Sequence, residues 1–191
     1  MIFATHNSNK LKEARAILEG HEIEGLLQLG FHEDIPETGN SFKANALIKA
    51  QAVRQRYGKA VFADDSGLVC AALNGDPGIY SARYAGEPPD HKANNQKLLK
   101  ELEGQSNRQA KFVTVIAFIN VQGEKHFFTG EVNGQILLNP RGEEGFGYDP
   151  VFQPEGHTRS FAEMAAQQKN QMSHRARALF QLRNYLNSRK S

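Results

Sequence analysis

The sequence has 191 residues, of which 39% are hydrophobic and 23% are charged, and its formal net charge is +2 at pH 7. This composition is that of an ordinary globular protein, and the length fits one domain, residues 1–191, that could be built of two lobes. Lysine and arginine are scattered rather than gathered in a stripe, which argues against nucleic acid as a partner. No stretch approaches 18 apolar residues and the first ten residues lack the layout of a secretory signal, so we expect no membrane span and a cytoplasmic protein.

Strands and helices alternate in the first half of the sequence, and the second half contains a hairpin. Apolar runs predict strands at residues 2–5, 23–29, 60–63, 111–121 and 125–132, with residues 68–73 as a further strand or a buried helix. Capping residues and periodicity predict helices from Asn7 or Ser8 to Gly20, from Ser41 to Gly58, from Asp90 to Gly104, over residues 160–163, and from Ser173 onward. These elements indicate an α/β fold, a mixed sheet with helices on both faces. The single cysteine, Cys70, lies in an apolar run and is expected to be a buried thiol.

The first polar cluster lies where the first strand runs into a helix N-terminus. It consists of Thr5, His6, Asn7, Ser8, Asn9 and Lys10. Backbone N–H groups at such a terminus attract anions, and Lys10 adds a full positive charge, so the cluster is a candidate phosphate site. A plain helix cap with a solvated lysine explains the same residues, and the glycine pattern of a Walker loop is absent.

The second cluster is acidic. Asp64 and Asp65 follow the strand at residues 60–63, and Glu37 lies in the loop before the long helix. One or two carboxylates together with phosphate oxygens are the ligands that Mg²⁺ takes, and a cation would offset the cost of burying neighbouring carboxylates. Because adjacent side chains on a strand point to opposite faces, at most one aspartate would be a direct ligand, and the other could cap backbone amides. The alternative is an ordinary turn, which the buried strand before it disfavours.

Three further clusters offer contacts for a nucleotide. Asn45 and Lys49 are four residues apart on one helix face, from which Lys49 could reach a polyphosphate or point into solvent. The loop GEEGFGYDP, residues 142–150, carries aromatic rings and an acceptor that suit a flat base, or else pack inward in a structural turn. Lys169 with residues 173–175 gathers hydrogen-bond donors that suit a carbonyl or phosphate group, or else form a capped helix with surface charges.

Taken in order, these clusters resemble the Ham1/RdgB family of inosine/xanthosine triphosphate pyrophosphatases. The resemblance rests on THNSNK, PETGNSFKANALIKA, ADDSGLVCAALNGDPGIYSARYAG, GFGYDPVF and EMAAQQKNQMSHRARAL, which run from the first strand to the last helix. It implies an elongated mixed sheet with flanking helices, two lobes around a nucleotide cleft, and a homodimer. It also implies Mg²⁺-dependent hydrolysis of deaminated purine nucleoside triphosphates (ITP, dITP, XTP) to the monophosphate and pyrophosphate. One departure is His6, where the family's first motif commonly has glycine.

The resemblance further implies a role for each site residue. The triphosphate would be held by Thr5, His6, Asn7, Ser8, Asn9, Lys10 and Lys49, and Ser66 would contact the substrate. Glu37 and Asp65 would bind Mg²⁺, with Asp65 also the proton acceptor. The base and sugar would be surrounded by Phe146, Gly147, Tyr148, Asp149, Lys169, His174 and Arg175. Two other functions stay open: a pyrophosphatase for modified pyrimidines, as in the similarly folded Maf proteins, and a module that binds nucleotide without hydrolysing it.

Overall fold

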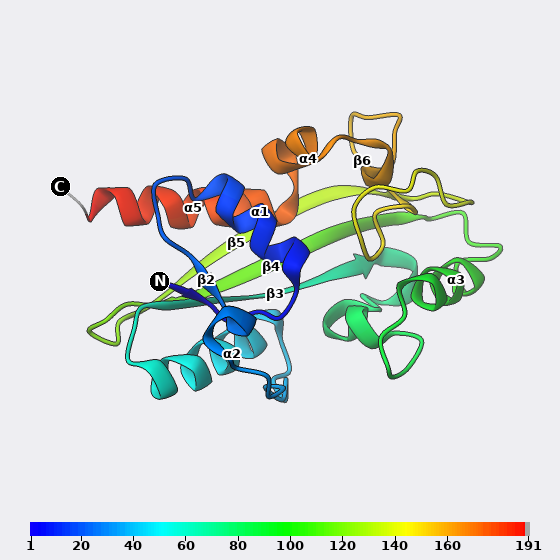
Figure 1. Cartoon of the computed structure of the whole chain (residues 1–191). Helices are drawn as coiled ribbons and strands as arrows, with labels where there is room; N and C mark the ends of the chain where they lie inside the picture. Colours follow the sequence, from blue (N-terminus) through cyan, green and yellow to red (C-terminus); the bar gives the residue numbers. More distant parts are fainter. Residues whose placement is uncertain (190–191) are drawn as a thin grey trace. The chain divides into compact units, whose positions relative to one another are not determined.

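The computed structural model describes residues 1–189, whose strands form one mixed sheet in the order β2-β1-β3-β4-β5-β6 (Figure 1). The strands are β1 (Ile2–Phe3), β2 (Glu24–Gly25), β3 (Val61–Cys70), β4 (Gln109–Ile119), β5 (Lys125–Ile136) and β6 (Phe152–Pro154). The helices are α1 (Ser8–Ile17), α2 (Phe42–Tyr57), α3 (His91–Glu101), α4 (Ala166–Met172) and α5 (His174–Ser188). β1 pairs in parallel with β2 and β3, whereas β5 and β6 are antiparallel. The expected mixed α/β sheet with flanking helices is confirmed.

The chain separates into two compact units. Unit 1 contains Met1–Asp65, Thr114–Gly130 and the segment from Arg175 onward, and unit 2 contains Ser66–Val113 and Glu131–His174. The three long strands β3, β4 and β5 each contribute residues to both units. The boundary along β3 falls directly after Asp65, so the adjacent aspartates belong to unit 1 and Ser66 to unit 2.

In unit 1 the sheet is covered on both faces. One hydrophobic cluster packs the sheet against α1 and α5, and a second packs it against α2 (Figure 1). Consecutive strand residues enter opposite clusters, as strand alternation requires: Ile2 and Phe3 in β1, Val61 and Phe62 in β3, and Ala117 and Ile116 in β4. This two-sided packing fixes the part of β3 that directly precedes Asp64 and Asp65.

In unit 2 one hydrophobic cluster is built on the sheet. Leu68 and Cys70 of β3 join Phe112 of β4 and Ile136 of β5, and Leu98 of α3 packs against them. The thiol of Cys70 is buried and free, as expected. Burial raises the pKa of this thiol to about 12.

The sequence predicted most elements with small shifts at their ends, but β3 is a correction. We expected a strand that ended before Asp64, and the structure shows one continuous strand from Val61 to Cys70. Aspartate is disfavoured in strands, yet here both carboxylates find partners within unit 1, so the ladder continues through them.

The remaining differences are local. The strand expected at residues 23–29 is only Glu24–Gly25, because Leu26–Leu29 forms a 3₁₀ helix that Gly30 closes with a φ of +66°. β6 and α4 were not predicted, since each is short and has weak periodicity. Within residues 1–189, no helix combines the length and the hydropathy that a membrane crossing needs.

Candidate active site

Asp64 is the centre of a buried ion-pair network in unit 1. Its Oδ1 lies 3.0 Å from the Lys10 ammonium, and its Oδ2 accepts from Nε of Arg175 at 3.0 Å. Burial alone would raise the pKa of Asp64, but the two cations more than offset it and hold the pKa well below its ordinary range. Asp64 is therefore ionised at neutral pH, and it neutralises cations rather than serving as a proton acceptor.

The same network includes Glu13, a residue that the sequence analysis did not single out. Arg175 donates from Nη1 to Glu13 at 2.6 Å, and the Arg175 side chain is almost fully buried. Burial opposes the charge of this guanidinium, but Glu13 and Asp64 raise its pKa above the ordinary arginine value. Glu13 lies three residues after Lys10, so a shared helix face was the available signal for this pairing.

Asp65 has a different environment from Asp64. Its Oδ2 accepts a hydrogen bond of 3.0 Å from Nδ2 of Asn45, a side chain on α2. Burial and the Glu37 carboxylate raise the pKa of Asp65 to about 6, although Lys49 and Asn45 partly oppose the shift. The alternation of β3 thus gives two adjacent aspartates opposite properties: a permanent anion at position 64 and a group that exchanges protons near neutrality at position 65.

Lys49 and Glu37 form an ion pair in the same unit, with the ammonium on the Glu37 carboxylate. Burial lowers the pKa of Lys49, but Glu37, Asp64 and Asp65 together raise it above its ordinary value. Burial also lowers the pKa of Lys10, and neighbouring Arg175 and Lys49 reinforce that shift against the pull of Asp64. Lys49 therefore points into the acidic cluster rather than into solvent, which resolves the alternative that the sequence left open.

Asn7, in the turn between β1 and α1, caps the N-terminus of α1. Its Oδ1 accepts the N–H groups of Asn9 and Lys10 at 2.9 and 3.1 Å, and its own N–H donates to Oγ1 of Thr5. Ser8 is the first residue of α1 rather than its cap. The Asn7 side chain already accepts the backbone N–H groups of Asn9 and Lys10, so an anion at this terminus would have to bind through other groups.

His6 contacts the backbone of a different loop. Its Nε2 lies 2.9 Å from the carbonyl oxygen of Phe31, and since a carbonyl only accepts, Nε2 is the donor. A phosphate contact by His6 would therefore have to use Nδ1. The histidine at this motif position joins the Thr5–Lys10 turn to the start of the segment that carries Glu37.

Unit 2 brings together the predicted base-binding residues around Asp149. Its Oδ2 accepts the Phe146 N–H at 2.8 Å and lies 2.6 Å from the Lys169 ammonium, both Asp149 and Lys169 being buried. The ammonium also lies 4.7 Å from the centre of the Phe146 ring. A Cβ on Gly145 would come within 2.2 Å of the Asp149 carboxylate, so only glycine allows this turn.

The neighbouring residues of unit 2 are held mainly by protein contacts. Tyr148 is buried and its hydroxyl donates to the Ser81 carbonyl at 2.9 Å, while Asn95 of α3 donates to the Gly147 carbonyl at 3.0 Å. The His174 ring stacks on Phe112 with ring centres 4.5 Å apart. Tyr148 thus supports the loop from inside, and Asn95 is a contact that sequence reasoning missed because it comes from a distant helix.

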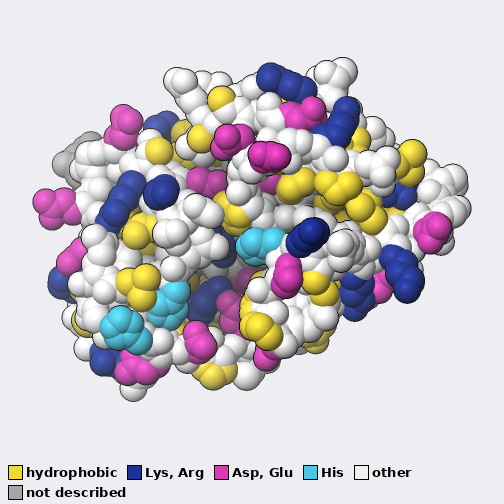
Figure 2. All heavy atoms as spheres, turned by 45° about the vertical axis from the view of Figure 1, so that its right-hand side comes forward, with side chains coloured by type: hydrophobic (Ala, Val, Ile, Leu, Met, Phe, Trp, Pro, Cys, Tyr) yellow, Lys and Arg dark blue, Asp and Glu magenta, His cyan; other side chains and the backbone are white. Residues whose placement is uncertain are grey.

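The structure therefore groups the predicted residues in two sets. Unit 1 holds Thr5, His6, Asn7, Ser8, Asn9, Lys10, Glu37, Lys49, Asp65 and Arg175, and unit 2 holds Ser66, Phe146, Gly147, Tyr148, Asp149, Lys169 and His174. Arg175, which the resemblance assigns to the base and sugar, pairs with Asp64 and Glu13 in unit 1. Acidic and basic side chains are interspersed over the face shown in Figure 2.

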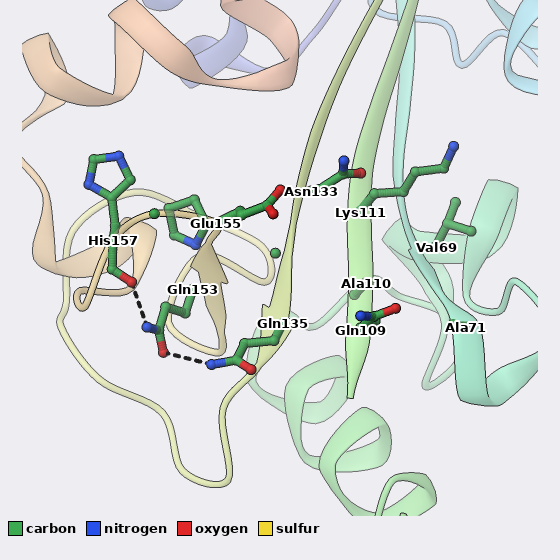
Figure 3. Close-up of a pocket in the computed structure, with 13 residues that line it drawn as sticks. Val69, Ala71, Gln109, Ala110, Lys111, Asn133, Gln135, Gln153, Glu155 and His157 are labelled. Carbon is green, nitrogen blue, oxygen red and sulfur yellow. Dashed lines mark hydrogen bonds between the residues drawn. The ribbon is translucent and has the colours of Figure 1, made fainter. Parts of the chain in front are cut away.

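Unit 2 also has a pocket of about 630 Å³ (Figure 3). Its lining includes polar side chains from the sheet, among them Lys111, Asn133, Gln135 and Gln153. Gln153 donates to the His157 carbonyl at 2.6 Å and accepts from Gln135 at 3.3 Å. Side-chain amide hydrogen bonds therefore connect these residues of the pocket wall. None of the predicted site residues lines this pocket.

Glu37 and Asp65 are the candidate ligands of a divalent cation. In residues 1–189, no three histidine, cysteine, aspartate or glutamate side chains gather into a metal-binding group. Mg²⁺ characteristically takes one or two carboxylates plus substrate phosphates, so two carboxylates are enough. The Lys49 ammonium already forms an ion pair with the Glu37 carboxylate. Glu37 also raises the pKa of Asp65, because the two carboxylates repel each other, and a bound cation would relieve this repulsion. The donor set fits Mg²⁺.

The similarity of this chain to known proteins extends over nearly the full length of both chains. The dITP/XTP pyrophosphatase of Porphyromonas gingivalis is 56% identical over 188 residues, covering 97% of this chain and 96% of that protein. The Staphylococcus aureus Ham1 protein superimposes with a TM-score of 0.90 at 40% identity, and a HAM1 protein from Coxiella burnetii with 0.89 at 41%, each covering 98% of both chains. The Ham1 family model matches residues 1–185. The chain belongs to the Ham1 family.

Proposed function

We propose that this chain hydrolyses deaminated purine nucleoside triphosphates, ITP, dITP and XTP, to the monophosphate and pyrophosphate, and so removes them from the nucleotide pool. The observation that carries the proposal is the cluster in unit 1, where buried cations meet Asp64 while Glu37 and Asp65 lie beside them. Binding a nucleotide needs cations, whereas the additional carboxylates near a phosphate site favour hydrolysis. Similar proteins named dITP/XTP pyrophosphatase support the same reaction.

Unit 1 provides the groups for the triphosphate. Lys10 and Lys49 would contact its oxygens, and Asp64 holds Lys10 in place through the ion pair at 3.0 Å. As the leaving pyrophosphate gains charge, these two ammonium groups would stabilise it. Thr5, Asn7 and Ser8 would complete the contacts at the turn, with the helix N-terminus contributing a partial positive charge.

Glu37 and Asp65 would hold Mg²⁺, which supplies neutralisation of the charge that builds on the phosphate oxygens during attack. The Lys49 ammonium, which contacts the Glu37 carboxylate, would then contact the phosphate oxygens. This arrangement needs no third protein carboxylate.

Asp65 would accept the proton of the attacking water as it approaches the α-phosphorus. An ordinary aspartate, with a pKa of roughly 4, is a poor base at neutral pH. Asn45 orients the carboxylate through Oδ2, and the bound cation would lower the pKa of the water, so a strong base is not required. The attack would be in line with the leaving pyrophosphate.

Unit 2 provides groups for the base. Phe146 offers an aromatic face, and the buried pair of Asp149 and Lys169 fixes the loop that carries it. Donors from this set and from His174 would pair with the oxygen at C6 of hypoxanthine or xanthine. Adenine presents an amino group there, which would leave these donors unsatisfied, and such mismatches reject a substrate by several orders of magnitude. Arg175 could contribute only with donors other than Nε and Nη1, which Asp64 and Glu13 accept.

The test is a substrate panel of ITP, dITP, XTP, GTP, ATP and dUTP with Mg²⁺, scored for pyrophosphate and orthophosphate. We expect pyrophosphate from the first three at rates far above the others, and no turnover in EDTA. Preference for dUTP would favour the Maf-like alternative, and binding of ITP without turnover would favour a non-hydrolysing module. Orthophosphate as the first product would overturn attack at the α-phosphorus.

Three accompanying assignments belong to the same proposal. Both units act as one pyrophosphatase domain, residues 1–191, the chain forms a homodimer, and it works in the cytoplasm, where its substrates arise. Sedimentation equilibrium at micromolar concentration checks the dimer, and a single protomer mass would contradict it. Fractionation of cells that express the chain checks the location.

A further inference from the structure

Asn45 makes two hydrogen bonds that join separate parts of unit 1. It lies in α2, three residues after the start of the helix, and its side chain is almost fully buried. Oδ1 accepts the N–H of Gly39 at 2.8 Å, and Nδ2 donates to Oδ2 of Asp65 at 3.0 Å. One amide therefore connects the loop that contains Glu37 to the middle of β3.

The orientation of this amide follows from its partners. A backbone N–H can only donate, so the atom facing Gly39 must be Oδ1. Nδ2 then faces Asp65, whose Oδ2 acts as the acceptor. Neither bond survives a flip of the amide, because a flip would set donor against donor at Gly39 and acceptor against acceptor at Asp65.

Gly39 is shaped for this contact. A Cβ at this position would come within 2.7 Å of Asn45 Oδ1, 2.9 Å of Asn45 N and 2.6 Å of the Ala44 Cβ. Backbone atoms and a rigid methyl group cannot move aside as a flexible chain end can, so any larger residue would push the loop away from the helix. The glycine here serves close approach rather than an unusual backbone conformation.

The segment from His32 to Gly39 has no helix or strand of its own. The Lys49 contact fixes the end of the Glu37 side chain, and Asn45 fixes the backbone two residues later. We propose that Asn45 is a positioning residue that sets the spacing between Glu37 and Asp65, the two carboxylates proposed to hold Mg²⁺. The inference rests on the proposed function and deepens it.

The experiment compares Asn45→Leu with a matched control, Asn120→Leu. Asn120, in the turn between β4 and β5, makes the same kind of pair, since its Oδ1 accepts the Glu124 N–H and its Nδ2 donates to the Glu124 carboxylate. Leucine has a similar size but removes both hydrogen bonds. Thermal unfolding is followed against Mg²⁺ concentration at a fixed, saturating concentration of IMP, and ITP hydrolysis is followed against Mg²⁺ in parallel.

We expect Asn45→Leu to need about tenfold more Mg²⁺ for the same rise in Tm and for half-maximal turnover, as losses around metal ligands typically show. Asn120→Leu should keep the wild-type Mg²⁺ dependence even if its Tm without Mg²⁺ is lower. Gly39→Ala breaks the contact from the loop side and should shift the Mg²⁺ dependence in the same direction, which decides the matter if Asn45→Leu does not fold.

Equal Mg²⁺ dependence in the wild type, Asn45→Leu and Gly39→Ala would overturn the inference and leave the proposed function standing. A wild type that hydrolyses ITP with no response to Mg²⁺ in either measurement would overturn the metal site and the inference together. A wild type that does not hydrolyse ITP at all would overturn the proposed reaction itself, which the substrate panel detects separately.

Discussion

The two units hold their polar site residues in different frameworks. In unit 1 the sheet has a hydrophobic cluster on each face, and the site contains linked ion pairs in which Asp64 meets both Lys10 and Arg175. In unit 2 one cluster is built on the sheet, and the site consists of aromatic side chains around a buried ion pair, Asp149 with Lys169. Sheet residues of unit 2 also line the pocket of Figure 3.

This difference matches the chemistry of the two ends of a nucleotide. A triphosphate and a divalent cation are densely charged, so the groups that bind them must be charged and held apart from water, and each buried charge needs a partner. A purine base is flat and uncharged, so an aromatic ring and a few directed donors are sufficient. The two-sided packing of unit 1 supplies the rigidity that linked ion pairs need, whereas the loop around Phe146 needs only its own ion pair.

The largest expected effect removes chemistry from unit 1 without disturbing its packing. Asp65→Asn has nearly the same size but cannot accept a proton, so turnover of ITP should fall roughly 10²- to 10⁴-fold, the usual contribution of a general base. Initial rates with saturating Mg²⁺ measure the loss, and near-UV circular dichroism checks the fold. Turnover within a few-fold of the wild type would remove Asp65 from its proposed role.

The next effect tests the linked ion pairs. Asp64→Asn leaves Lys10 and Arg175 without the carboxylate they share, so the free energy of unfolding should fall by about 3–5 kcal/mol. The control is Lys111→Ala, which breaks an exposed pair with Glu131 and should cost less than about 1 kcal/mol. Urea titration measures both, and similar losses in the two variants would show that burial adds nothing to the Asp64 network.

The adjacent aspartates should also differ in how they link stability to pH. Because the pKa of Asp65 is raised to about 6 in the folded protein, the folded state binds its proton more tightly than the unfolded chain. The stabilisation from this group is complete near pH 4 and is lost as the pH rises through about 6. In EDTA, the unfolding free energy of the wild type relative to Asp65→Asn should therefore fall by about 2–3 kcal/mol from pH 4 to pH 7. A rise over the same interval would contradict the assigned shift.

The smallest effect belongs to unit 2. Phe146→Ala removes the aromatic face proposed to stack on the base, a contribution of about 1–3 kcal/mol, so KM for ITP should rise about tenfold with a smaller change in kcat. Tyr80→Ala, at an exposed aromatic residue of the same unit, is the matched control and should leave both constants unchanged. A fall in kcat at constant KM would instead give Phe146 a part in the chemical step.

Local signals in the sequence predicted the helices well. Ser41 and Gly58 bound α2, and Asp90 caps α3, because capping depends on neighbouring residues that the sequence displays directly. The strand through Asp64 and Asp65 was cut short in the prediction, because aspartate has low strand propensity. What extends it is pairing with cations from other elements, and Arg175 is 111 residues away in the sequence.

The same limit applies to the site. Lys49 on α2 was predicted as a candidate because of its spacing from Asn45, but its partner Glu37 comes from a loop whose path the sequence does not reveal. His6 stands where the family commonly has glycine, and only the carbonyl of Phe31 shows which nitrogen of the ring donates. A residue that acts through a contact between distant elements, such as Asn95, leaves no local pattern to find.

The buried thiol at the end of β3 provides a built-in reporter. Cys70 is the sole cysteine of the chain, and with a pKa of about 12 it is almost never a thiolate at neutral pH while enclosed. An alkylating reagent should therefore modify the native protein only during transient opening of the surrounding core, at a rate set by the free energy of that opening. Labelling kinetics would thus follow breathing motions of unit 2 without any added probe.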